Sequence, residues 1–228
     1  MGTQAVRTAS VAGPLRVRHR RPADAIAFVV ATIVYALAAG LVGPVKSVSG
    51  TETAVFRAIN GLPNWMSPPI VVVMQAGMLA AVPVATAACL LFRRFLMAVS
   101  VGLSGVAAYL LAKAAKHIID EPRPKAILDH VHVRDTIGGL GFPSGHAAVS
   151  AAIVVAALPF LPKRWRPVVV LVPLAVAFAR IYVGAHLPLD VVGGAGLGVA
   201  AASLVHLAIG VPLRAERPDE VPPEPVPE

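Results

Sequence analysis

Three short polar segments contain nearly all the side chains of this chain that could do chemistry. They are residues 116–124, residues 143–146 and the stretch from Arg180 to Asp190. Each of them borders a long apolar run. A charged side chain costs roughly 2.5–3.5 kcal/mol at the centre of a bilayer on insertion scales, so cations beside membrane-length runs lie at an interface or line a cavity. The three segments are therefore candidates for a functional site.

The segments combine three cations with the start of a predicted helix. Lys116, Arg123 and Arg180 supply the positive charges, and Ser144 and Gly145 open the helix, with Ser144 as its N-cap. The first backbone N–H groups of a helix have no partner within it and attract anions. No acidic cluster accompanies these residues in the sequence. The set favours a site for a multiply charged anion, most naturally phosphate.

Two histidines add the means for acid–base or nucleophilic chemistry. His186 and Asp190 are four residues apart, a spacing that lets a carboxylate hold an imidazole in one tautomer when the turn between them is helical. An imidazole held in this way is a nucleophile or a base. His146 supplies the second, separately placed imidazole that acid–base chemistry needs.

The remaining histidines have simpler interpretations. A single histidine at a helix end is usually a satisfied interfacial residue, which is our interpretation of His19, His117 and His206. His130 and His132 lie near Asp129 and Asp135 and indicate an aqueous loop face rather than a metal site, with recognition of a lipid headgroup as the alternative. Arg180 differs, because no acidic residue is near it in the sequence and it needs a partner such as a bound anion. No metal ion or other cofactor is expected.

Composition places the chain in the membrane class. Apolar residues make up 57% of it and charged residues 14%, and the mean hydropathy is +0.74, all outside the norm for soluble proteins. The net charge of +8 comes from cations scattered between apolar runs, which argues against a nucleic-acid partner. The single cysteine, Cys89, lies in an apolar run and excludes a disulfide framework or a thiolate cluster.

The apolar runs predict an all-α, polytopic membrane protein with a six-transmembrane helix bundle. The expected spans are residues 23–45, 68–92, 95–115, 144–161, 167–183 and 188–211, each near the length that crosses a bilayer. Apolar residues around Arg57 predict a short amphipathic helix at the interface after the first span. Ala36-Leu37-Ala38 could belong to a signal peptide, but the first run exceeds the usual apolar region of about 7–15 residues. A retained helix is favoured.

Small residues predict close helix contacts in two of the spans. They are Gly102, Gly105, Ala107 and Ala108 in the third, and Gly193, Gly194, Gly196 and Gly198 in the sixth. Residues 1–22 are expected to form a basic cytoplasmic tail, residues 23–213 the membrane domain, and residues 214–228 a disordered, Pro- and Glu-rich cytoplasmic tail.

Charge bias predicts the orientation, since Lys and Arg are enriched in short cytoplasmic loops. With the N-terminus inside, the inner segments hold Arg93, Arg94, Lys163, Arg164, Arg166, Arg214, Arg217 and the five arginines of the tail. An even number of spans puts both termini in the cytoplasm. It also puts all three polar segments on the extracytoplasmic face of the plasma membrane, where they would form one site.

The three segments together resemble a known family signature. Lys116-x6-Arg123-Pro124, Pro143-Ser144-Gly145-His146 and Arg180-x5-His186-x3-Asp190 are similar to the three motifs of the type 2 phosphatidic acid phosphatase superfamily. The resemblance covers about residues 68–211. One departure is Ala179, where the family usually has serine, which removes one possible hydrogen bond to phosphate.

The resemblance implies a metal-independent phosphatase with a phosphohistidine intermediate. His186 would attack phosphorus, Asp190 would orient it, and His146 would protonate the leaving oxygen. The charge on the transferred phosphoryl group would be neutralised by Lys116, Arg123, Arg180 and the amides of Ser144 and Gly145.

The substrate implied by this resemblance is a lipid phosphate in the bilayer. Candidates are a polyprenyl diphosphate, phosphatidate, phosphatidylglycerol phosphate and a polyprenyl-linked sugar phosphate. A lipid phosphotransferase would use the same intermediate, whereas an anion transporter would need the cations but neither His146 nor the His186–Asp190 pair. Vanadium-dependent haloperoxidases share the signature, but six spans make that alternative remote. The sequence names neither the lipid nor the oligomeric state.

Overall fold

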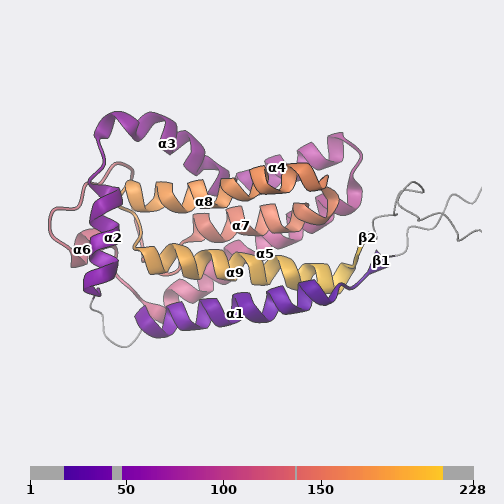
Figure 1. Ribbon diagram of the computed structural model, residues 1–228, viewed down its shortest axis with the longest axis horizontal. Helices are drawn as coiled ribbons and strands as arrows, with labels where there is room; N and C mark the ends of the chain where they lie inside the picture. The colour runs from indigo at the N-terminus through magenta and orange to yellow at the C-terminus, as the bar shows by residue number, and fades with distance from the viewer. Residues whose placement is uncertain (1–17, 43–47, 137, 213–228) are drawn as a thin grey trace, which may run out of the picture.

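The computed structural model describes residues 18–42, 48–136 and 138–212, and within them the fold is helical, as predicted. Long helices run side by side in an elongated bundle (Figure 1). The helices are α1 (Pro22–Val42), α2 (Gly50–Asn60), α3 (Ser67–Met74), α4 (Ala81–Leu91), α5 (Phe95–Ile119), α6 (Pro124–Ile127), α7 (Gly145–Ala157), α8 (Arg166–Tyr182) and α9 (Pro188–Ile209). Short 3₁₀ turns are η1 (Asn64–Met66), η2 (Gln75–Gly77), η3 (Leu158–Phe160) and η4 (Lys163–Trp165).

The two predicted tails lie mostly outside the described residues. Within the described part, β1 (Arg18–His19) pairs antiparallel with β2 (Val211–Pro212), although no folded element was expected before residue 23. His206 is buried at this end of the bundle, and its ring contacts Asp24 Oδ1 at 3.1 Å and the carbonyl oxygen of Ala156 at 3.3 Å. The polar atoms of this histidine are thus satisfied, as predicted, but inside the bundle rather than at an interface.

Helix α9 packs against α1, α5 and α7 and forms the centre of the bundle. Its glycines permit this, as the sequence predicts. A Cβ atom added at Gly198 would overlap the carbonyl oxygen of Ala148, and one added at Gly194 would overlap the carbonyl oxygen of Ser144. The backbones of α7 and α9 therefore approach each other at a distance that only glycine allows.

Replacing Gly198 with alanine is expected to destabilise the fold, because the added methyl group must push α9 away from α7. The cost should be about 1–3 kcal/mol, as for other overpacked sites, and should appear as a lower midpoint of thermal unfolding in detergent. Gly40→Ala is the matched control, since a Cβ atom at Gly40 meets nothing within 4 Å. Equal loss in both variants would contradict this account of the α7–α9 contact.

Four helical segments are long and apolar enough to cross a membrane, namely Pro22–Val42, Phe95–Ile127, Lys163–Tyr182 and Pro188–Ile209. Asn64–Gly77 and Ala81–Leu91 together pass the same test, but they are bent by 70° at a break. Counting this pair as one span gives five, and Gly145–Phe160 is a further, shorter apolar helix. Several apolar helices thus place the chain among multi-pass membrane proteins.

The second span predicted for residues 68–92 is not one unbroken helix, because the chain bends between α3 and α4. Pro83 disfavours a helix that continues from residue 79, since its ring crowds that residue's carbonyl, and it lies in the first turn of α4. Gly77 packs in the break, where an added Cβ would lie 2.6 Å from the carbonyl oxygen of His146 and 2.9 Å from Val176 Cγ1. The break therefore rests directly on a candidate site residue.

Helix α2 forms where the amphipathic segment predicts a helix. Its N-cap is Ser49, whose hydroxyl oxygen accepts from the N–H of Glu52 at 3.2 Å. It stands across the end of the long helices (Figure 1) and turns Glu52 and Asn60 inward, where both are buried. This end of the bundle is also where the three polar segments meet.

Candidate active site

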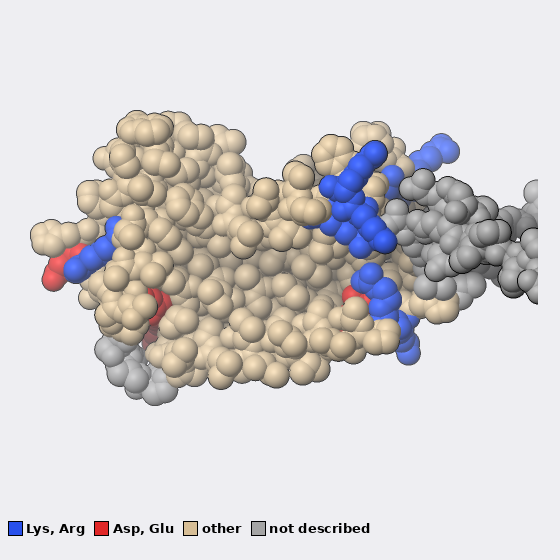
Figure 2. Space-filling view, in the orientation of Figure 1, with Lys and Arg blue, Asp and Glu red and all other residues tan. Residues whose placement is uncertain are grey.

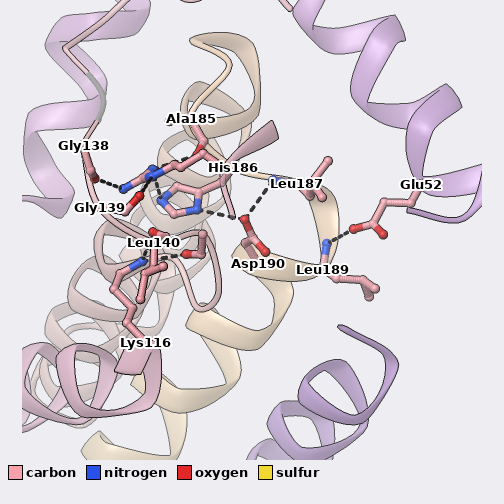
Figure 3. Close-up of polar contacts among 12 residues, drawn as sticks. Glu52, Lys116, Gly138, Gly139, Leu140, Ala185, His186, Leu187, Leu189 and Asp190 are labelled. Atoms are coloured by element: carbon pink, nitrogen blue, oxygen red, sulfur yellow. Dashed lines mark hydrogen bonds and ion pairs between the residues drawn. The ribbon is translucent and has the colours of Figure 1, made fainter. Parts of the chain in front are cut away.

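His186 and Asp190 form the centre of the site. His186 lies in the loop that leads into α9, and Asp190 lies in the first turn of that helix, so the two side chains face each other (Figure 3). His186 Nδ1 is 3.0 Å from Asp190 Oδ2, which also accepts from the N–H of Leu187 at 3.0 Å. Because a carboxylate can only accept, Nδ1 carries the proton and Nε2 presents a lone pair.

Arg123 occupies the other side of the same imidazole. Its Nη1 donates to His186 Nε2 at 3.1 Å and to the carbonyl oxygen of Ala185 at 2.7 Å. Nη2 and Nε donate to the carbonyl oxygens of Gly138 and Gly139 at 2.8 and 3.3 Å. Four of the five N–H donors of Arg123 thus bond to the loop and to His186, so the imidazole is held in a fixed orientation.

Burial and the surrounding cations determine the charge of His186. The ring is 1% exposed, and its burial, followed by the guanidinium of Arg123, holds the pKa of His186 well below its usual range. Arg180 and Lys116 add to the same effect. The imidazole is therefore neutral at neutral pH, which is the form that can act as a nucleophile.

Lys116 lies near the end of α5 and reaches the loop ahead of α7. Its Nζ donates to the carbonyl oxygens of Leu140 and Gly141 at 2.7 and 2.6 Å (Figure 3). The ammonium group thus ties the first polar segment to the loop that leads into the second. Lys116 is therefore more than a snorkelling residue at a helix end.

Ser144 is the N-cap of α7, as predicted, but its amide is already engaged. The N–H of Ser144 donates to the carbonyl oxygen of Asp190 at 2.9 Å, so of the two amides assigned to phosphate only that of Gly145 remains. The hydroxyl of Ser144 is buried and without a hydrogen-bond partner among the described residues. It and the first turn of α7 are left as donors.

His146 is half-buried in that first turn and lies against the break in the second apolar segment, through its contact with Gly77. The charges of Arg123, Arg180 and Lys116 all act on it, as they do on His186. The structure thus brings both histidines into one cationic environment.

Arg180 is 4% exposed and does have an acidic partner, contrary to the expectation from its sequence neighbours. Its Nη1 lies 3.5 Å from Asp135 Oδ2, in the loop between α6 and α7, and 3.0 Å from Met74 Sδ at the end of α3. Its Nε is buried and has no partner in the part of the chain that the structure describes. A buried guanidinium donor without an acceptor is open to an anion.

Two carboxylates near Asp190 were missed, because no acidic cluster was expected. The side chain of Glu121 lies at hydrogen-bonding distance from that of Asp190, and Glu52 Oε1 accepts from the N–H of Leu189 at 2.8 Å (Figure 3). Glu121 stands in the first polar segment, two residues before Arg123, which was the available signal. Glu52 is 137 residues away from its partner, so no local pattern indicates it.

The loop between α6 and α7 is held against the bundle by Asn60 and Arg134. Asn60 Nδ2 donates to the carbonyl oxygens of His132 and Tyr182 at 2.8 and 3.0 Å. Arg134 donates to the carbonyl oxygens of Asn60, Leu62 and Tyr182 and lies 4.3 Å from the centre of the Tyr182 ring. The segment that carries Asp135 is thereby held against α8, next to Arg180.

Comparison with known families covers all three polar segments. The model described as "PAP2 superfamily" matches residues 95–211, which is more than half of the chain. The chain belongs to the PAP2 superfamily.

Curated relatives of this PAP2 chain are phosphatases. It is 30% identical over 115 residues to an undecaprenyl-diphosphatase of Sulfolobus acidocaldarius, covering 50% of this chain and 56% of the relative. It is 40% identical over 62 residues to a lipid A 4'-phosphatase of Bacteroides thetaiotaomicron, covering 27% and 28%. It is 33% identical over 118 residues to a decaprenylphosphoryl-5-phosphoribose phosphatase of Mycobacterium tuberculosis, covering 51% and 63%. The matched region spans less than two thirds of each relative.

Solved structures support the fold of the PAP2 chain. The crystal structure of Aquifex aeolicus LpxE aligns with a TM-score of 0.66 and 21% identity, over 71% of this chain and 97% of that one. The transmembrane PAP2-type phosphatidylglycerolphosphate phosphatase from Bacillus subtilis aligns with a TM-score of 0.62 and 22% identity, over 78% and 93%. At these identities the likeness concerns the fold.

Ala179, which stands where the PAP2 motif usually has serine, makes apolar contacts. Ala179 is 1% exposed and packs with Met74, Tyr182, Val183 and Ala185.

The described residues include no group of three or more His, Cys, Asp or Glu side chains arranged to hold a metal ion.

Proposed function

We propose that the chain hydrolyses a phosphate monoester or a diphosphate of a membrane lipid through a phosphohistidine on His186. One observation carries the proposal: Asp190 and Arg123 hold a neutral, buried imidazole by its two nitrogens, inside a group of cations. The names of the relatives, several of which act on polyprenyl-linked or lipid A phosphates, support the substrate class.

In the proposed reaction, the phosphate displaces the hydrogen bond between Arg123 and His186 Nε2. The nitrogen then attacks phosphorus and the P–O bond to the lipid breaks. His146, which takes up a proton when the phosphate anion binds and offsets the surrounding cations, gives that proton to the departing oxygen. Asp190 keeps the Nδ1 proton and offsets the positive charge of the phosphoimidazole. Water next attacks phosphorus and gives a proton to His146, the P–N bond breaks, and phosphate is released with His186 neutral again. The negative charge on the phosphoryl oxygens would be neutralised by the side chains of Lys116, Arg123 and Arg180, the hydroxyl of Ser144 and the amide of Gly145.

A panel of lipid phosphates tests this function. The purified protein in detergent should release inorganic phosphate from at least one polyprenyl diphosphate, phosphatidate, phosphatidylglycerol phosphate or polyprenyl-linked sugar phosphate. Phosphate that appears on an added alcohol instead would identify a phosphotransferase. Anion transport by reconstituted protein that survives loss of both His146 and His186 would identify a transporter.

The reaction is expected to need no metal ion, because the proposed charges on the phosphoryl group are all met by Lys, Arg and N–H groups. Phosphate release from the best substrate should be unchanged by excess EDTA. The matched experiment adds back magnesium after dialysis against the chelator. Loss of activity in EDTA followed by recovery with magnesium would reject this part of the mechanism.

We also propose six spans, with α7 and the bent α3–α4 pair each crossing, α2 at the outer interface and both termini in the cytoplasm. Lys and Arg side chains gather at the end of the bundle opposite the candidate site (Figure 2). Arg94 contacts Phe160 there, and Arg21, Lys163 and Arg166 line one cavity. Such an excess of cations is typical of the cytoplasmic side of the plasma membrane.

This topology predicts that Thr136, an exposed loop residue near the site, faces the outside of the cell. Thr136→Cys in a Cys89→Ser background should react with a membrane-impermeant thiol reagent in intact cells. Arg164→Cys at the opposite end is the control and should react only after lysis. The reverse pattern would overturn the orientation.

A further inference from the structure

We propose that Glu121 is a positioning residue that shares one proton with Asp190, so that the pair of carboxyl groups carries a single negative charge behind the nucleophile. The kinetic part of this inference rests on the proposed function. The shared proton itself does not.

The geometry leaves two carboxyl oxygens without a donor. Asp190 is 0% exposed and Glu121 is 8% exposed. Asp190 Oδ1 and Glu121 Oε2 are both buried and unpartnered among the described residues, and their side chains lie at hydrogen-bonding distance from each other. Two ionised carboxylates at this distance would repel strongly in a buried site, whereas one proton between them satisfies both oxygens.

The other contacts of Asp190 indicate how the pair is arranged. Asp190 Oδ2 already accepts from the Nδ1–H of His186 and from the N–H of Leu187. Asp190 is therefore the acceptor, and Glu121 donates the shared proton to Oδ1. The chain of hydrogen bonds runs from Glu121 through Asp190 to His186, which keeps Asp190 from rotating and from taking the Nδ1 proton of the histidine.

Glu121 is held from the loop side and faces three other charged groups. Its backbone carbonyl accepts from the N–H of Gly141 at 2.7 Å, and its carboxyl group lies within electrostatic reach of Lys116 of α5, Glu52 of α2 and Asp190 of α9. A small cavity of about 20 Å³ lies behind it, lined by Glu52, Glu121 and Leu189 among others. This volume admits about one water molecule, through which the shared proton can exchange with solvent.

Substitution of Glu121 by glutamine or by leucine distinguishes a need for a hydrogen-bond donor from a need for side-chain volume. The amide of Glu121→Gln can still donate to Asp190 Oδ1, whereas Glu121→Leu cannot. We expect Glu121→Leu to lose kcat on the order of 10–100-fold, as outer hydrogen-bond partners of metal ligands do, with a much smaller change in KM, and Glu121→Gln to recover most of that loss at neutral pH. Asp120→Asn, the same carboxyl-to-amide replacement at an exposed neighbour, is the matched control.

The pH profile gives a signature that a purely structural role would not. As the pH rises, the pair loses its shared proton and gains a second negative charge beside the phosphate, so the activity of the wild type and of Asp120→Asn should fall on the alkaline side. The amide donor of Glu121→Gln cannot lose its proton in this range, so the activity of this variant should fall only at a higher pH. An unmoved decline, or equal losses in the glutamine and leucine variants, would refute the shared proton.

Infrared spectroscopy tests the pair without any substrate. At neutral pH the wild type and Asp120→Asn should show the C=O stretch of a protonated carboxyl group that Glu121→Gln lacks. A band that persists unchanged in Glu121→Gln would overturn the inference. If the wild type hydrolyses no lipid phosphate, the proposed function fails, while the infrared band still decides whether the proton is shared.

Discussion

Replacing His186 with alanine is expected to abolish phosphate release from every ester, with a fall in kcat on the order of 10⁵–10⁶-fold, as for the loss of a nucleophile elsewhere. The reason is that no leaving group, however good, can bypass the nitrogen that attacks phosphorus. The measurement is release of inorganic phosphate from the best lipid substrate and from p-nitrophenyl phosphate.

Two controls make that result specific. His117→Ala changes an exposed histidine at the end of α5 and should behave as the wild type. Rapid acid-free quenching should trap label from a ³²P-substrate on the wild-type chain and not on His186→Ala. Labelled His186→Ala protein would show that another residue is the nucleophile.

Replacing His146 with alanine should have an effect that depends on the leaving group. A lipid alkoxide is strongly basic and needs a proton as it departs, whereas a nitrophenolate does not. We expect a loss on the order of 10²–10⁴-fold on the lipid phosphate and a much smaller loss on p-nitrophenyl phosphate.

The interpretation requires that the variant still binds phosphate, because His146 also lies in the first turn of α7. Protection by vanadate against thermal unfolding should therefore be compared between His146→Ala and the wild type. With binding intact, equal losses on the two substrates would show that His146 is not the general acid.

The residues of the three motifs could be found from the sequence because each spacing has a local cause. His186 and Asp190 meet across the first turn of α9, and Ser144 is the N-cap of α7. Charge bias and span counting also suffice to predict that the segments share one end of the bundle. The partners of these residues could not be found in this way. Arg180 meets Asp135, and Glu52 meets Leu189, through folding of distant segments.

The broken second segment shows a different limit. Hydropathy is nearly uniform from residue 68 to residue 92, so hydropathy averaged over a sliding window predicts a single span there. Pro83 and Gly77 were the available signals, but proline and glycine are common in membrane helices and do not by themselves predict a break. The position of the break depends on tertiary packing, since Gly77 lies against the backbone of His146.

The close contact of α7 with α9 divides the site into a fixed half and an adjustable half. The backbone of Ser144 bonds to that of Asp190, and Gly194 leaves no room between them. The two histidines therefore cannot move apart without separating the central helices. Lys116 and Arg123 are held instead by carbonyl oxygens of a loop, bonds that a phosphate can exchange one at a time. In the proposed mechanism, the cations would therefore adjust to headgroups of different size, while the distance between His186 and His146 would stay the same from one substrate to the next.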